Sequence, residues 1–261
     1  MGRVVAIANQ KGGVGKTTTA INLGACLAEL GQRVLLCDID PKGNATTGLG
    51  IRKADSEQSM YEVIIDSQPM RDAVQATSVE GLHIVPGSVD LAGAEVELVT
   101  TERREYRLRQ ALEPMRPRYD FVIVDCPPSL GLMTLNALTA ADTVLIPLQC
   151  EYYAMEGLTQ LLRTVQLVQG GLNPGLRIEG IVLTMFDGRT NLSIQVADEV
   201  KRYYREKVYR TVIPRSVRLS EAPSHGRPIS RYDPRSRSSE VYKELAREVL
   251  ARGEAGTRAR A

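Results

Sequence analysis

A glycine-rich segment near the N-terminus contains the residue types best suited to chemistry. Residues 10–18 read Gln-Lys-Gly-Gly-Val-Gly-Lys-Thr-Thr and directly follow an apolar run over 4–8. Gly12, Gly13 and Gly15 allow backbone N–H groups to converge on an anion without Cβ clashes. An apolar strand leading into such a turn and then a helix is the setting of a phosphate-binding loop. The alternative interpretation is a glycine-rich turn with no ligand.

Two side chains at the end of this segment extend the phosphate-binding pattern. Lys16 is placed to reach the β- and γ-phosphates of a nucleotide, and the hydroxyl of Thr17 can bind Mg²⁺. The residues that follow, 18–30, have the pattern of a helix. Because the strand, the glycines, the Lys-Thr pair and the helix agree, the segment predicts a nucleotide site rather than a turn with a stray lysine.

Three carboxylates follow apolar strand patterns further along the chain. Asp38 and Asp40 lie at the end of the run 34–39, and Asp125 ends the run 121–124 in a Walker B arrangement. Ligands of open α/β sheets bind at the carboxyl ends of strands. Side chains alternate across a strand, so Asp38 and Asp40 cannot point the same way. One can face the phosphates while the other anchors the loop and the metal shell. Asp125 is expected to help hold Mg²⁺.

The bulk composition fits a single α/β domain. The chain has 261 residues, 43% hydrophobic and 25% charged, and no run approaches the roughly 20 apolar residues that span a bilayer. We expect one domain over 1–252, a disordered basic tail over 253–261, and no signal peptide. The four cysteines have no C-x-x-C spacing, which favours reduced thiols in a cytoplasmic protein.

Charge is distributed unevenly along the chain. From residue 201 to the end there are 16 Lys and Arg against 7 Asp and Glu, although the net charge of the whole chain is only +2. A basic C-terminal quarter is typical of a surface that contacts nucleic-acid phosphates. The alternative is a solvated basic surface with a frayed end.

The elements that must position these residues alternate between strand and helix patterns. We predict a doubly wound, mostly parallel sheet flanked by helices. The strands are expected at 4–8, 34–39, 82–85, 121–124, 144–147, 178–185 and 208–213, and the longer helices at 18–30, 91–112, 155–169, 194–204 and 239–252.

The motifs together resemble the ParA/MinD group of deviant Walker A P-loop ATPases, and most of all its short chromosomal ParA type, also called Soj. The resemblance rests on the loop Lys-Gly-Gly-Val-Gly-Lys-Thr with its extra Lys11, on Asp-x-Asp-Pro-x-Gly-Asn from Asp38, and on Asp-Cys-Pro-Pro-Ser from Asp125. It extends from Val4 to about Leu250. It implies that Lys11 reaches the nucleotide of a second subunit and that Asp40 orients the attacking water.

The resemblance also implies a full set of site residues. The implied catalytic residues are Lys11, Lys16 and Asp40. The implied metal-binding residues are Thr17, Asp38 and Asp125. The nucleotide is expected to contact Lys11, Gly12, Gly13, Val14, Gly15, Lys16, Thr17 and Thr18, with Met185, Pro214 and Ser216 on the adenine side. Ser216 departs from the Asn that many relatives have there. Arg189 and Arg218 match positions that contact DNA phosphates in chromosomal ParA proteins.

The expected partners follow from the same resemblance. They are ATP and Mg²⁺, a second copy of the chain as a homodimer, non-specific double-stranded DNA, and a ParB-type activator, with a replication initiator as a further candidate. No membrane is expected, and the protein would lie in the cytoplasm, associated with the nucleoid.

Three other functions are alternatives to a partition ATPase for a chain with these motifs. A MinD-like membrane ATPase would need an amphipathic C-terminal helix, but residues 239–250 suit packing on the domain better than insertion into lipid. An iron–sulfur reductase would need paired interface cysteines, which Cys126 and Cys150 do not obviously provide. A small-molecule P-loop enzyme such as a synthetase would need a dedicated substrate pocket.

Overall fold

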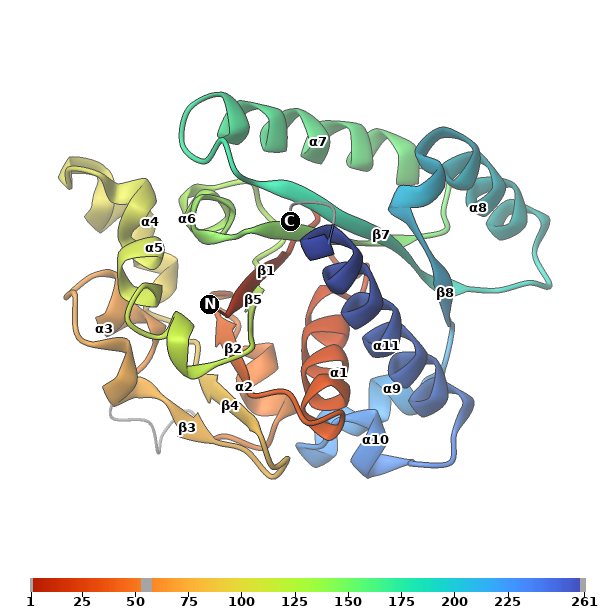
Figure 1. Cartoon of the computed structure of the whole chain (residues 1–261), viewed down its shortest axis with the longest axis horizontal. Coiled ribbons are helices and arrows are strands. Elements are labelled where there is room, and N and C mark those ends of the chain that lie inside the picture. The colour runs from red at the N-terminus through yellow and green to blue at the C-terminus, as the bar shows by residue number, and fades with distance from the viewer. Residues whose placement is uncertain (1, 53–57, 259–261) are drawn as a thin grey trace.

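One eight-stranded sheet forms the centre of the computed structural model, which describes residues 2–52 and 58–258 (Figure 1). The strand order is β3-β4-β2-β5-β1-β6-β7-β8, and every neighbouring pair is parallel except β3 and β4. The strands are β1 (Arg3–Ile7), β2 (Val34–Asp38), β3 (Gln75–Ala76), β4 (Leu82–Val85), β5 (Phe121–Asp125), β6 (Thr143–Gln149), β7 (Arg177–Phe186) and β8 (Val208–Pro214). The predicted fold class is confirmed.

Helices cover both faces of this sheet (Figure 1). One face is covered by α1 (Lys16–Glu29), α2 (Asn44–Gly48), α9 (Val217–Glu221), α10 (Ile229–Tyr232) and α11 (Arg237–Arg258). The other face is covered by α3 (Met60–Ile64), α4 (Leu91–Glu97), α5 (Arg107–Leu112), α6 (Leu132–Ala140), α7 (Ala154–Gly170) and α8 (Asn191–Tyr204). The strands are therefore buried on both sides, as their near-continuous apolar runs predict.

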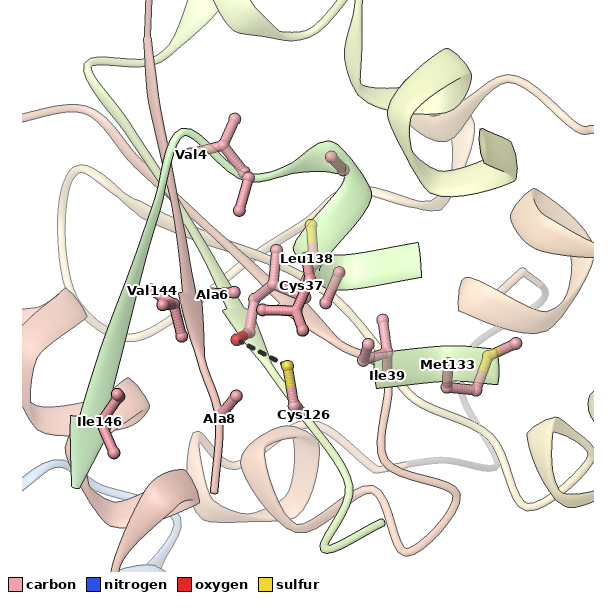
Figure 2. Close-up of a cluster of buried hydrophobic side chains, with 14 of the residues drawn as sticks. Val4, Ala6, Ala8, Cys37, Ile39, Cys126, Met133, Leu138, Val144 and Ile146 are labelled. Carbon is pink, nitrogen blue, oxygen red and sulfur yellow. Dashed lines mark hydrogen bonds between the residues drawn. The ribbon is translucent and has the colours of Figure 1, made fainter. Parts of the chain in front are cut away.

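The side chains of the central strand β1, and of Ala8 directly after it, are divided between two apolar clusters. Val4, Ala6 and Ala8 face the α3–α8 side, where Figure 2 shows them beside Cys37, Cys126, Val144 and Ile146 from neighbouring strands. Val5 and Ile7 face α1 and α11. This alternation follows from the two-residue repeat of a strand. All four cysteines of the chain are buried and free, which agrees with the prediction of reduced thiols.

The seven predicted strands are all present, with ends shifted by no more than two residues. The short edge strand β3 was not predicted, because two residues carry no periodic signal; it pairs antiparallel with β4. The predicted helix over 91–112 is wrong. It is divided into α4, the 3₁₀ turns Leu98–Thr100 and Arg104–Tyr106, and α5.

A partner distant in sequence stabilises this break. Arg103 lies in the left-handed region at φ 54°. The side chain of Asn136 on α6 accepts a hydrogen bond from the N–H of Leu108 (3.1 Å) and donates one to the carbonyl of Arg104 (2.9 Å). A long-range cap of this kind satisfies backbone groups that a continuous helix would pair internally, and helical periodicity cannot reveal it.

The last helix extends further than expected. Helix α11 continues to Arg258, so the predicted boundary at Gly253 does not coincide with its end, and residues 259–261 lie outside the described residues. The helix continues through two glycines, Gly253 and Gly256, among Ala, Glu and Arg residues, which favour helix. Within the described part of the chain, no helix is long and apolar enough to cross a bilayer.

Candidate nucleotide-binding site

The glycine-rich loop connects β1 to α1 at the carboxyl edge of the sheet. Gly13 and Gly15 have φ values of 76° and 88°, in the left-handed region that glycine adopts without strain. Gly15 caps α1, whose first residue is Lys16. A Cβ added at Gly12 would have Pro128 Cβ as its nearest neighbour at 3.8 Å, so a side chain at Gly12 fits within one subunit. The loop therefore has the shape of a phosphate cradle at a helix N-terminus.

Two neighbouring strands hold this loop in place. The hydroxyl of Thr184, on β7, donates to the carbonyl of Val14 at 2.8 Å. Asn9 donates to the carbonyl of Pro147, on β6, at 2.7 Å. The side chain of Val14 is buried, so only its backbone can face a ligand. These bonds fix the loop before any ligand arrives, which lowers the cost of ordering it on binding.

Lys16 points its ammonium group back over the loop. Its side chain is buried, and Nζ donates to the carbonyl of Lys11 at 3.0 Å. Burial lowers the pKa of Lys16, whereas the nearby carboxylates of Asp125 and Asp40 raise it. A phosphate anion offers this cation a stronger partner than a neutral carbonyl does.

Both side-chain oxygens of Asp38 accept hydrogen bonds from within the protein. Its Oδ2 accepts from the N–H and the hydroxyl of Thr46, at 2.8 and 2.7 Å, and its Oδ1 accepts from the N–H of Asp40 at 3.3 Å. Burial raises the pKa of Asp38 to about 6, in spite of these hydrogen bonds. The structure therefore favours Asp38 as an anchor of the loop and of α2 over a direct role in holding a metal.

Asp125 is in the opposite situation. It is fully buried at the end of β5, and neither of its side-chain oxygens has a hydrogen-bond partner among the described residues. Burial and the neighbouring Asp38 raise its pKa well above the usual range, and the Thr17 hydroxyl and Lys16 lower it. A buried carboxylate with two unpartnered oxygens requires an explanation, and a cation or ordered water is the usual one.

These residues fit a magnesium ion bound together with phosphate. The described residues contain no cluster of three or more His, Cys, Asp or Glu that could hold a metal by itself. Mg²⁺ in nucleotide sites keeps several waters and takes few protein ligands, with phosphate oxygens completing its shell. The hydroxyl of Thr17 and the free oxygens of Asp125 are suited to that arrangement.

A cavity of about 590 Å³ lies beside the loop. Gly15, Thr17 and Thr18 from the phosphate loop and α1 line it, and so do the predicted adenine-side residues Met185, Pro214 and Ser216. Met185 has a φ of 49°, which is uncommon for a side chain of its size and typical of functional sites. The structure thus brings together, around one cavity, residues separated by about 200 positions in the sequence.

Sequence reasoning missed several residues at this site. Asn44 and Thr47 on α2 line the cavity together with Thr184. Asn44 stands in the motif that begins at Asp38, which was a usable signal, whereas Thr184 gave none. Glu151 was also missed; it forms an ion pair with Lys11 inside the same chain, with both side chains partly exposed.

The two arginines predicted to contact DNA lie on the surface and are already paired. Arg189 forms a two-bond ion pair with Asp187, at 2.8 and 2.7 Å, although its side chain is 88% exposed. Arg218 pairs with Glu221 at 3.0 Å and approaches Asp233 at 3.6 Å. Neither arginine lines the cavity.

The fold and the loop define the class of protein: a P-loop ATPase with a deviant Walker A sequence. A family model described as an AAA domain matches residues 2–178. The chain is 65% identical over 253 residues to the sporulation initiation inhibitor protein Soj of Bacillus subtilis, covering 97% of this chain and all of that protein. It is 56% identical over 252 residues to the chromosome partitioning protein ParA of Caulobacter vibrioides, covering 96% and 94% of the two chains. The chain therefore belongs to the ParA/Soj family of partition ATPases.

Solved structures agree on the fold. Cobyrinic acid a,c-diamide synthase of Mycobacterium smegmatis, bound to an ATP analogue and magnesium, is 41% identical with a TM-score of 0.86, covering 98% of this chain and 97% of that one. MinD of Pyrococcus horikoshii with Mg-ADP is 27% identical with a TM-score of 0.80, covering 95% and 96%. The higher identity to Soj and ParA favours partition over the synthetase and MinD-like alternatives.

Proposed function

We propose that this protein is a chromosome- or plasmid-partitioning switch that binds DNA as an ATP-bound dimer and releases it after hydrolysis. The observation that carries the proposal is the convergence of Lys16, Asp40 and Asp125 at the phosphate loop, where neither Asp125 oxygen has a hydrogen-bond partner among the described residues. Identity of 65% to Soj over nearly the whole chain supports the partition role. ATP is the substrate, and Mg²⁺ is the resident metal ion.

Each residue of the site has a specific task in hydrolysis. Lys16 leaves the Lys11 carbonyl and neutralises the phosphates, a contact that grows stronger as charge develops in the transition state. Asp40, whose Oδ1 accepts from the N–H of Lys42 at 3.0 Å, orients the attacking water. When bound, Mg²⁺ supplies charge neutralisation at the phosphates, and Thr17 and Asp125 hold it.

Dimerisation depends on the loop at Lys11 and Gly12. The Lys11 ammonium exchanges its Glu151 partner for a phosphate of the second subunit's nucleotide. Because the pair is partly exposed, breaking it costs little, about 0.2–1 kcal/mol. Two nucleotides at the interface make the association dependent on ATP.

DNA binds non-specifically to a basic surface that includes Arg189 and Arg218. Arg215, which is exposed, lies near enough to Asp187 to lower the pKa of that carboxyl. A closed dimer presents two copies of this surface, and phosphate contacts read no sequence. A ParB-type partner stimulates hydrolysis, and a replication initiator is a second partner. The protein acts in the cytoplasm, on the nucleoid.

Two variants test the nucleotide part of this proposal. Lys16→Ala should lose tight ATP binding in a nucleotide titration, and wild-type affinity would overturn the assignment of the loop. Asp40→Ala should bind ATP and Mg²⁺ normally, hydrolyse it poorly and therefore accumulate as a dimer in size-exclusion chromatography with ATP. An Asp40→Ala protein that stays monomeric would remove Asp40 from the hydrolytic role.

A further inference from the structure

A second cavity lies apart from the nucleotide site. It has a volume of about 460 Å³ and lies where α3, the 3₁₀ turn Met70–Ala73 and α5 meet, toward the side of the molecule that carries α3 and α5 (Figure 1). None of the residues that line it also lines the nucleotide cavity. Its volume is within the range of small-molecule sites, about 300–1,000 Å³.

The lining of this cavity is strongly cationic. Arg71, Arg107 and Arg118 all line it, and none of the described residues that line it is Asp or Glu. The three arginines come from separate elements, the turn Met70–Ala73, helix α5 and the 3₁₀ turn Arg116–Arg118. Three like charges around one hollow repel one another, so an anion placed between them is stabilised.

The hydrogen-bonding capacity of these arginines is largely unused. Nε of Arg107 is buried and has no partner among the described residues, and one of its terminal nitrogens bonds only the neutral hydroxyl of Ser67. No ion pair joins Arg107 or Arg118 to an acid within the described part of the chain, whereas Arg71 contacts Asp72 at 3.3 Å. A buried guanidinium N–H without an acceptor is costly, and an oxyanion would satisfy it.

Part of the lining of this cavity is apolar. Val63, Met70 and Met115 are buried residues of the core that also line the cavity. An apolar wall facing a few convergent polar groups is the usual composition of a ligand site. Such a lining suits a molecule with an acidic group at one end and a carbon body at the other.

We propose that this cavity is a second ligand site, for a small anionic molecule whose phosphate or carboxylate group is bound by Arg107 and Arg118. Arg107 donates from its buried Nε–H, and Arg118, which is exposed, binds the anion from the solvent side. The site is independent of the proposed DNA surface and of ATP hydrolysis.

Calorimetric titration with two simple probes tests this site. The protein is first saturated with Mg-ADP so that its phosphate loop is filled, and is then titrated with inorganic phosphate or with succinate. At least one probe should bind wild type, and Arg107→Gln and Arg118→Gln should each weaken that binding about tenfold, the effect of losing one charged hydrogen bond. Preference for one probe identifies a phosphate or a carboxylate ligand.

The matched control is Arg163→Gln, which removes the same charge from an exposed position on α7 outside the cavity. It should change binding less than twofold. Arg118 is exposed, so its variant tests the site even if Arg107→Gln fails to fold. The proposal is overturned if neither probe binds, or if Arg118→Gln and Arg163→Gln weaken binding equally.

Discussion

Asp38 and Asp125 are register partners at the carboxyl ends of the adjacent strands β2 and β5, and both are fully buried. The oxygens of Asp38 accept hydrogen bonds from Thr46 and from the backbone of Asp40, whereas neither oxygen of Asp125 has a hydrogen-bond partner in the part of the chain that the structure describes. Burial raises the pKa of both carboxyl groups, and the neighbouring Asp38 raises that of Asp125 further. A cation bound beside Asp125 would offset part of the cost of burying this carboxylate.

The first prediction concerns Asp125→Asn. Replacing this buried carboxyl group by a neutral amide should stabilise the protein without ligand at pH 7 by about 1–3 kcal/mol, measured by urea unfolding, because the amide carries no charge that burial penalises. The same variant should lose the extra thermal stabilisation that Mg²⁺ gives to the ATP complex of wild type. Lower stability without ligand, or an undiminished Mg²⁺ effect, would contradict the role given to Asp125.

The second prediction is a pH dependence that originates at Asp38. Its folded pKa, about 6, is above the value of an unfolded Asp, so the folded state binds more protons between about pH 4 and 6. Stability is then present at the low end of this window and is lost as pH rises through it. Relative to Asp38→Asn, wild type should lose up to about 1.4 kcal/mol per pH unit. A difference in unfolding free energy between wild type and Asp38→Asn that stays constant from about pH 4 to 6 would contradict the raised pKa of Asp38.

The third prediction separates dimerisation from nucleotide binding. A side chain at Gly12 has room within one subunit, where Pro128 is its nearest neighbour at 3.8 Å. Gly12→Val should therefore bind ATP with nearly wild-type affinity and remain monomeric, because the valine meets the second subunit. Light scattering in ATP and a nucleotide titration measure the two properties. If the Gly12→Val protein still dimerises in ATP, the dimer interface does not include this loop.

The fourth prediction uses the Asp187–Arg189 pair. The hydrogen bonds from Arg189 hold the pKa of Asp187 at about 2, so this carboxylate competes with DNA phosphate for Arg189. Asp187→Asn should tighten DNA binding and steepen the plot of log affinity against log salt by roughly two units per dimer. Arg189→Gln should weaken binding and flatten the plot by a similar amount.

The control for the Asp187 variant is Glu80→Gln, an exposed acid in the turn before β4. It removes the same negative charge without releasing Arg189. If Asp187→Asn and Glu80→Gln change DNA binding equally, the effect comes from net charge alone. The basic surface would then be exposed to solvent without contacting DNA.

The sequence predicted the sheet and the phosphate loop well because both depend on local signals. Apolar runs located the seven longer strands, and Gly13 and Gly15 occupy the positive-φ positions that only glycine fills easily. Contacts between distant segments could not be predicted in the same way. Asn136 caps the break in the helix expected over 91–112. Thr184 anchors the phosphate loop, and the hydroxyl of Thr46 donates a hydrogen bond to Asp38. Each of these partners is chosen by the fold and leaves no periodic trace in the chain.

In the proposed cycle ATP controls DNA binding, and this control is measured by DNA retention in different nucleotide states. Wild type and Asp40→Ala are applied to two unrelated immobilised duplexes with ATP, with ADP and without nucleotide. Both proteins should be retained on both duplexes with ATP but not with ADP or without nucleotide, and retention should last longer for Asp40→Ala. Equal retention in all three states, or none with ATP, would contradict it.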